Sequence, residues 1–211
     1  MRARWPIVAA VAVAIALYVW LPDELVVGPP IVRYVVPALE LLFLLTLTLH
    51  GPHRRLVEAG IRRETSMALI ALVSLGNALA LAFLLHQLLY SGGVQGRTLL
   101  YAAFDLWVTN VIAFALWFWE LDGGGPEARA TSPEAPRDFA FVQMTDPEVA
   151  AEGWEPRFAD YLYLAFTNAS AFSPTDTMPL TRRAKMLMLL QSAVSIVTLL
   201  LVAARAVNIL R

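Results

Sequence analysis

Residues 160–210 read DYLYLAFTNASAFSPTDTMPLTRRAKMLMLLQSAVSIVTLLLVAARAVNIL, and the order of properties along this stretch decides the fold. A helix over the aromatic segment 158–168 is about 16 Å long, roughly half the hydrocarbon core of a bilayer. A hydroxyl-rich turn, residues 169–176, and a basic step, residues 181–185, lead to an apolar run, 186–210, without proline or glycine. Irregular backbone at membrane depth must be covered by protein or water. The order therefore predicts a re-entrant half-helix and loop followed by a membrane-spanning helix.

The composition places the whole chain in the membrane class. Hydrophobic residues make up 58% of the 211 residues and charged residues 16%, and the mean hydropathy is +0.61. These values are far from those of a soluble domain. The net charge of −1 gives no basic field for nucleic acid. Without cysteine, and with only three scattered histidines, the sequence predicts no metal site and no cofactor.

Four further apolar runs precede the opening stretch: residues 5–21, 31–49, 66–90 and 97–119. We therefore expect an all-α polytopic membrane protein with five transmembrane helices plus the re-entrant half-helix. Its parts are a four-helix transmembrane region (1–119), a polar linker or cap rich in proline and glycine (120–157), and the half-helix, turn and last helix (158–211). The sequence has no catalytic motif of a known hydrolase or phosphate-binding enzyme, so we expect no enzyme activity.

The distribution of basic residues predicts the orientation. With the N-terminus in the cytoplasm, cytoplasmic segments hold twelve of the sixteen Lys and Arg residues, and the opposite side holds four. The positive-inside rule favours this arrangement. We expect a multi-pass protein of the cell (inner) membrane, with a cytoplasmic N-terminus and lipid as its surroundings.

Residues 166–176, FTNASAFSPTD, resemble the end of the pore helix and the selectivity filter of potassium channels. That pattern is an aromatic residue, small or hydroxyl residues, TVGYG and then an aspartate, and it aligns on Asp176 without a gap. Pro179, the basic step and the ending VAARAVNIL resemble the inner helix of such a channel. The layout resembles as closely a family of bacterial membrane proteins of unknown function, whose last helix ends in LAVNLL.

The resemblance to potassium channels implies a homotetramer that conducts monovalent cations through a central pore. The filter-like turn would consist of Thr167, Asn168, Ser170, Phe172, Ser173, Pro174, Thr175 and Asp176.

The filter-like turn departs from the potassium-channel pattern in ways that change its chemistry. Ser173 and Thr175 stand where that filter has glycines, and Pro174 stands where it has tyrosine. Glycine allows backbone dihedrals that aim successive carbonyls at the ion, and proline fixes φ and lacks an N–H. We therefore expect side-chain oxygens of Ser170, Ser173, Thr175 and Asp176 to form a wider ring, with low or non-potassium selectivity.

The last helix carries a polar stripe at steps of four and three residues, which places its members on one face. The stripe would line the pore if it faced water, whereas hydrogen bonding between packed helices is the alternative. Its members are Gln191, Ser195, Thr198, Val202 and Arg205.

Three residues within the predicted spans are candidate intramembrane charges: Glu40, Asp105 and Arg205. Such residues are functional candidates by default, and Glu40 and Asp105 suggest a proton-coupled transporter as an alternative function. The absence of an internal repeat argues against that alternative. Asp105 could instead reach interfacial water, and Arg205 could extend to the interface. A non-conducting scaffold of channel-like shape is the third possibility.

Overall fold

The computed structural model describes residues 61–90 and 96–209, apart from 133, 147, 149, 152 and 172–175, together with eight single residues between 9 and 41. The predicted spans 5–21 and 31–49 therefore lie largely outside the described residues. Within that part of the chain, three helices are long and apolar enough to cross a membrane, judged by length and composition.

The three long helices correspond to the last three predicted spans. They are α4 (Ile61–Tyr90), α5 (Gly96–Leu121) and α9 (Arg182–Ile209). Both α4 and α9 begin four or five residues before their predicted spans. The extensions consist mainly of Arg, Lys, Glu and Ala, which favour helix but carry no hydropathy signal.

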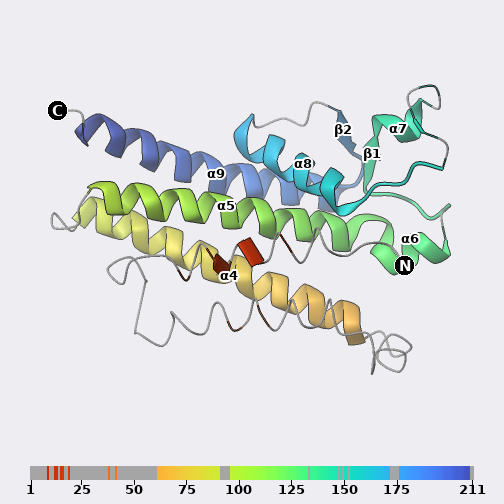
Figure 1. Ribbon diagram of the computed structural model, residues 1–211, viewed down its shortest axis with the longest axis horizontal. Helices are drawn as coiled ribbons and strands as arrows, with labels where there is room; N and C mark the ends of the chain where they lie inside the picture. The colour runs from red at the N-terminus through yellow and green to blue at the C-terminus, as the bar shows by residue number, and fades with distance from the viewer. Residues whose placement is uncertain are drawn as a thin grey trace.

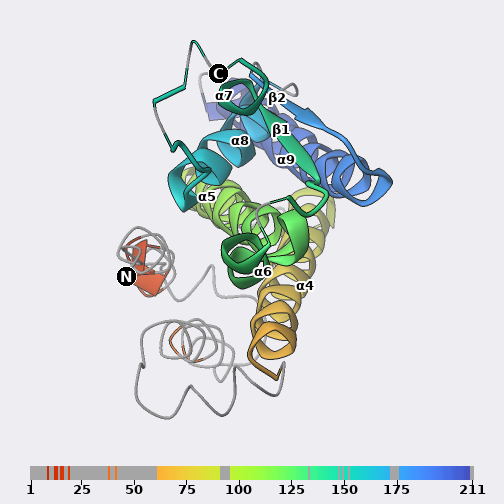
Figure 2. The ribbon, with the colours of Figure 1, turned by 90° about the vertical axis from the view of Figure 1, so that its right-hand side faces the viewer.

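Helix α5 is the centre of the bundle. Figure 1 shows α4, α5 and α9 running lengthwise beside one another, and the end-on view of Figure 2 places α4 on one side of α5 and α8 and α9 on the other. About two thirds of the apolar window of α5 is buried (67%), against 28% for α4 and for α9. The core between these elements includes Phe114, Phe118, Tyr161, Leu164 and Ala165.

Helix α8 (Phe158–Ser170) has 13 residues, less than half the length of α9. The N–H of Arg157 donates to the Asp160 carboxylate (2.6 Å) at its start, where a negative charge also suits the helix dipole. The predicted short helix, residues 158–168, agrees with α8 to within two residues. Its apolar face packs on α5 and α9, and Trp107 of α5 contacts Phe166 edge-on.

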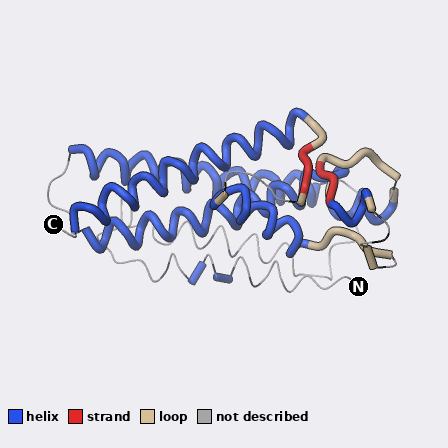
Figure 3. The backbone as a smooth tube through the Cα atoms, turned by 90° about the horizontal axis from the view of Figure 1, so that it is seen from above, coloured by secondary structure: helices blue, strands red, loops and turns tan. Residues whose placement is uncertain are grey.

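The chain leaves α8 and returns to the end of the bundle where α8 began. Strand β2 (Thr177–Pro179) follows the turn and pairs antiparallel with β1 (Phe139–Phe141), with Phe141 opposite Thr177. Figure 3 shows this two-stranded sheet at the end of the bundle away from the C-terminus. Helix α9 then starts beside the sheet and runs back along α5 (Figure 1).

The segment between α5 and α8, apart from the four residues in it that are not described, forms an ordered cap. It contains the 3-10 turn η2 (Asp122–Gly124), α6 (Pro126–Thr131), strand β1 and α7 (Val142–Thr145). Phe141 contacts Tyr161 and Trp154 with ring centroids 5.3 and 5.9 Å apart. The sequence did not decide whether this segment is a linker or a cap. It did not predict the sheet, because strands of three residues are too short to show an alternation of polar and apolar residues.

Candidate functional site

Polar side chains gather at two places in the described part of the bundle. The first, here called the amide junction, lies between α5, α8 and α9 and comprises Asn110, Asn168, Gln191, Ser192 and Ser195. The second, here called the arginine–aspartate cap, lies where α5 ends and comprises Asp122, Arg129, Arg137, Asp138, Tyr161, Thr181 and Arg183. Both combine residues that are distant in sequence.

The amide junction joins the C-terminal end of α8 to α9 by side-chain hydrogen bonds. Asn168 donates from Nδ2 to Gln191 Oε1 (2.8 Å) and to the Met188 carbonyl (3.0 Å). Gln191 donates from Nε2 to the Ala165 carbonyl (2.8 Å), so the two amides bind each other's helices. The Ser192 hydroxyl adds longer contacts, 3.3–3.4 Å, to oxygens of Asn168. Asn168 and Gln191 are fully buried, and these bonds satisfy them there.

The same junction reaches α5 through Asn110, whose Nδ2 donates to Ser195 Oγ (3.0 Å) and lies 3.4 Å from the Gln191 carbonyl. Gln191, Ser195 and Thr198 are at most 1% exposed. Val202, one turn further along, packs partly buried against Leu99 and its neighbours. Within one chain, the four described members of the stripe, Gln191, Ser195, Thr198 and Val202, thus pack against neighbouring helices, as in the alternative that the sequence left open.

The predicted filter-like turn is described only at its two ends. Thr167 is buried and donates to carbonyls of its own helix, and Ser170 is exposed and donates to the Phe166 carbonyl (2.7 Å). Asp176 accepts from the Thr177 hydroxyl (3.2 Å), and its carbonyl accepts from the Val142 N–H (3.2 Å). Phe172, Ser173, Pro174 and Thr175 lie outside the described residues.

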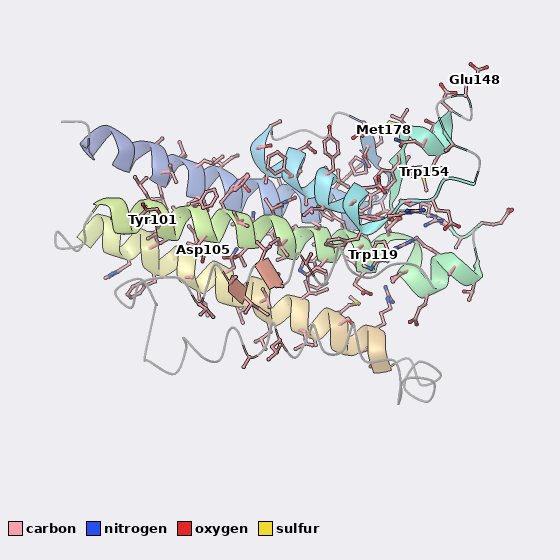
Figure 4. All side chains as sticks on the ribbon, viewed as in Figure 1. Tyr101, Asp105, Trp119, Glu148, Trp154 and Met178 are labelled. Carbon is pink, nitrogen blue, oxygen red and sulfur yellow. The ribbon has the colours of Figure 1, made fainter. Side chains whose placement is uncertain are left out.

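Among the three predicted intramembrane charges, only the side chain of Asp105 is described. It is 7% exposed on α5 and covered by protein, and its Oδ1 has no hydrogen-bond partner among the described residues. Figure 4 shows Asp105 on the part of α5 away from Trp119 and the cap. Glu40 and the side chain of Arg205 lie outside the part of the chain that is described.

Asp122 and Asp138 organise the arginine–aspartate cap. Asp122 accepts from the Tyr161 hydroxyl (2.6 Å) and from the backbone N–H groups of Asp138 (2.7 Å) and Phe139 (3.2 Å). It is wholly buried, so its carboxylate ties α8 and strand β1 to the end of α5.

Asp138 joins the start of α9 to the same place. The Arg183 guanidinium grips its carboxylate with two nitrogens (2.6 and 2.5 Å), the Thr181 hydroxyl donates at 2.5 Å, and the Gly123 N–H donates at 3.2 Å. Burial alone raises the pKa of Asp138, but hydrogen bonds from Arg183 and Thr181 outweigh burial and hold its pKa below the usual 3.8.

Arg129 is the buried cation of the cap. Its Nη1 donates to the carbonyls of Asp122 (2.6 Å) and Trp119 (2.8 Å). Its guanidinium carbon lies 4.7 and 5.3 Å from the ring centroids of Trp119 and Tyr161, within the range of cation–π contacts. Burial lowers the pKa of Arg129 from its usual value, although the nearby Tyr161 and Asp122 oppose that change. Arg129 thus joins α6 to the end of α5 and to the ring of Tyr161.

Sequence reasoning missed the cap as a site. Its only local signal is the run DGGGP directly after a span, followed by arginines and an aspartate, which is also typical of a solvated loop. The three glycines adopt positive φ of 55°, 83° and 100°, a conformation that other residues rarely take. They turn the chain back over the end of α5, and this turn brings Arg129, Arg137 and Asp138 to Asp122.

No group of three or more His, Asp or Glu side chains suited to a metal ion occurs among the residues described. The fold and these two polar clusters define a class: a mostly helical protein whose described residues include three helices long and apolar enough to cross a membrane, with a polar cap at one end. Comparison with known proteins adds no family, because no family model, no curated protein and no solved structure matches this chain.

We predict that the amide junction stabilises the bundle through direct coupling of Asn168 and Gln191. Asn168→Ala and Gln191→Ala should each lower the free energy of unfolding by about 1–2 kcal/mol, because each leaves a buried polar partner unsatisfied. The double variant should lose about 1 kcal/mol less than the sum of the two. Unfolding in detergent micelles measures all three. Ser170→Ala is the control and should change stability by less than about 0.5 kcal/mol; strict additivity would contradict the coupling.

We predict that Asp138→Asn costs about 2 kcal/mol of stability at pH 7, since it removes a charged acceptor of three side-chain bonds while the half-exposed Arg183 regains water. The pKa of Asp138 is lowered by folding, so its contribution is present above the unfolded pKa and lost as the pH falls through the folded value. The difference in stability between wild type and variant should therefore begin to narrow below about pH 4 and continue to narrow toward pH 3. Thermal unfolding from pH 7 to pH 3 measures it; a constant gap would contradict the pKa shift.

Proposed function

We propose that α8 re-enters the membrane from the cap side and that the turn after it shapes a cation passage between several copies of the chain. The observation that carries the proposal is the course of the chain around α8. The helix starts at the cap, where Phe158 contacts Trp119, and ends beside Met188 and Gln191 of α9. The chain then returns to the cap, where β2 pairs with β1.

The length of α8 supports this reading. Thirteen residues make a helix of about 20 Å, which is too short for a hydrocarbon core of about 30 Å. A helix that ends inside lipid leaves its last carbonyls without water. Here the Ala165 carbonyl binds Gln191, the Asn168 carbonyl lies near Ser192, and the Thr167 carbonyl accepts from the Ala171 N–H. The inner end of α8 is thus equipped to stay in an apolar layer.

The passage belongs to the face of α8 that α5 and α9 leave uncovered. Because Gln191 and Ser195 are used in packing, the proposal does not assign them to a water-filled wall. Tyr163, Phe166 and Ser170 are exposed on α8 in the single chain, and the turn 171–176 continues from them. Several copies arranged around an axis would bring these turns together, and the resemblance to potassium channels suggests four copies. Asp176 would then give the ring its negative charge, which favours cations.

The arrangement of helix ends supports a cytoplasmic cap. The start of α4, the end of α5 and the start of α9 meet at one end. Arg63 near the start of α4 lies close to Gly125, with its Nε 3.5 Å from where a Cβ of residue 125 would stand. Arg183 at the start of α9 binds Asp138 of the cap. Arginines therefore collect at this end, as the positive-inside rule expects for the cytoplasmic face. The N-terminus lies on the same side if both of the first two predicted spans cross.

A proton-coupled carrier is the second candidate, and Asp105 is the observation that favours it. A buried carboxyl oxygen without a hydrogen-bond partner among the described residues is costly as a charge and is suited to taking up a proton. This candidate assigns transport to the centre of α5 and requires nothing of the turn 171–176.

We predict that the purified protein in liposomes gives a cation flux above that of empty liposomes, and that Asp176→Asn lowers this flux severalfold because the ring loses its negative charge. Asp146→Asn is the matched control: it removes an exposed carboxylate from the cap and should leave the flux unchanged. Potassium and sodium gradients with a voltage-sensitive dye measure the effect.

The same experiment separates the candidates. Flux that Asp105→Asn abolishes and Asp176→Asn leaves intact would replace the channel with the proton-coupled carrier. No flux under any gradient, from protein that remains folded and oligomeric, would contradict both and leave a non-conducting scaffold.

A further inference from the structure

The arginine–aspartate cap gathers charged residues from separate parts of the chain. Its arginines are Arg129, Arg137 and Arg183, and Arg63 of α4 lies beside it. Three buried carboxylates, Glu120, Asp122 and Asp138, accompany them, and Glu127 lies in the same helix as Arg129. Because these charges balance, an anion from outside the chain would be held by individual donors and not by net charge.

Arg129 offers a fixed donor for that anion. Its Nη1 is committed to two carbonyls, and its guanidinium carbon lies within cation–π distance of Trp119 and Tyr161. Its Nη2 has no hydrogen-bond partner among the described residues, although the residue is only 4% exposed. A cation–π contact is not a hydrogen bond, so the aromatic rings do not satisfy this nitrogen.

Arg137 offers a second donor close by. Its Nη1 lies 3.6 Å from Asp122 Oδ2, beyond hydrogen-bond distance, and also has no hydrogen-bond partner within the described ranges. Arg129 and Arg137 both approach Gly123, with Cγ of the first and Cδ of the second each 3.1 Å from where a Cβ of residue 123 would stand. The side chain of Arg137 is 16% exposed, so it reaches the surface while Arg129 does not.

We propose that Arg129 and Arg137 bind a phosphate group, carried by a lipid headgroup or present as inorganic phosphate. Phosphate oxygens accept paired hydrogen bonds from guanidinium edges, and such charge-assisted bonds are strong. Arg129 is held in place by two carbonyls, whereas the side chain of Arg137 reaches the surface and has only the 3.6 Å contact to Asp122. Lipid phosphates lie at the level where a span ends, which places one source beside the cap. The site does not require that the protein conducts ions.

The test measures Tm in lipid-free detergent micelles, with sodium phosphate against sodium chloride at equal ionic strength. Mixed micelles with phosphatidic acid against phosphatidylcholine form the second arm. At about ten times Kd, the bound probe should raise the Tm of the wild type by about 4 °C. Arg137→Gln should reduce that rise to less than about 1 °C, and Arg137→Lys, which keeps the charge but loses the fork, should weaken binding about tenfold. Arg182→Gln, an exposed arginine at the same end, should retain the full rise.

Each outcome decides the proposal. A rise with sodium phosphate identifies free phosphate as a ligand, and a rise with phosphatidic acid alone identifies the headgroup. If neither sodium phosphate nor phosphatidic acid raises the Tm of the wild type, the site is overturned. It is also overturned if the Tm of Arg137→Gln rises as much as that of the wild type. If Arg182→Gln and Arg137→Gln reduce the rise in Tm equally, the anion is attracted by the general positive charge of this end, and the proposed site is overturned. If Arg137→Gln does not fold, Arg137→Lys carries the comparison.

Discussion

The structure depends on one constraint: a helix of about 20 Å, shorter than the hydrocarbon core of a bilayer, ends inside an apolar bundle, where its polar groups must find partners in protein. Asn168 and Gln191 meet this constraint together. Each amide donates to the other residue or to a carbonyl of the other residue's helix, and Asn110 extends the junction to α5. The C-terminal end of α8 is thereby fixed at one position along α9.

The arginine–aspartate cap holds the N-terminal part of α8 in place. Asp122 stands at the end of α5 and binds the Tyr161 hydroxyl near the start of α8, while Asp138 binds Arg183 at the start of α9. Two buried carboxylates therefore set the positions of both helices against α5, and the aromatic rings of Trp119, Phe139 and Phe141 fill the space around Tyr161. Both ends of α8 are thus held by side-chain hydrogen bonds.

The sequence predicted the elements that depend on local composition and missed those that depend on distant pairing. The long helices and the half-length α8 follow from apolar runs and their interruptions, and the ends differ by a few residues. The helical spacing of Gln191 and Ser195 showed that they share one face of the last helix. It could not show which helices pack against that face, because a helical period carries no information about the neighbouring element. The cap was missed for the same reason: Asp122 and Tyr161 lie 39 positions apart, and Asp138 and Arg183 lie 45 apart.

The central claim, that α8 enters and leaves on one side of the membrane, has a direct test because the chain contains no cysteine. Glu148→Cys lies in the cap before α8, and Leu180→Cys lies after β2; both positions are exposed. A membrane-impermeant thiol reagent applied to right-side-out and inverted vesicles reports the face of each, with Gly93→Cys, between α4 and α5, as the marker of the opposite face. The account predicts that positions 148 and 180 are labelled from the same face and position 93 from the other. Labelling of positions 148 and 180 from opposite faces would make the segment between them a full crossing and contradict the account.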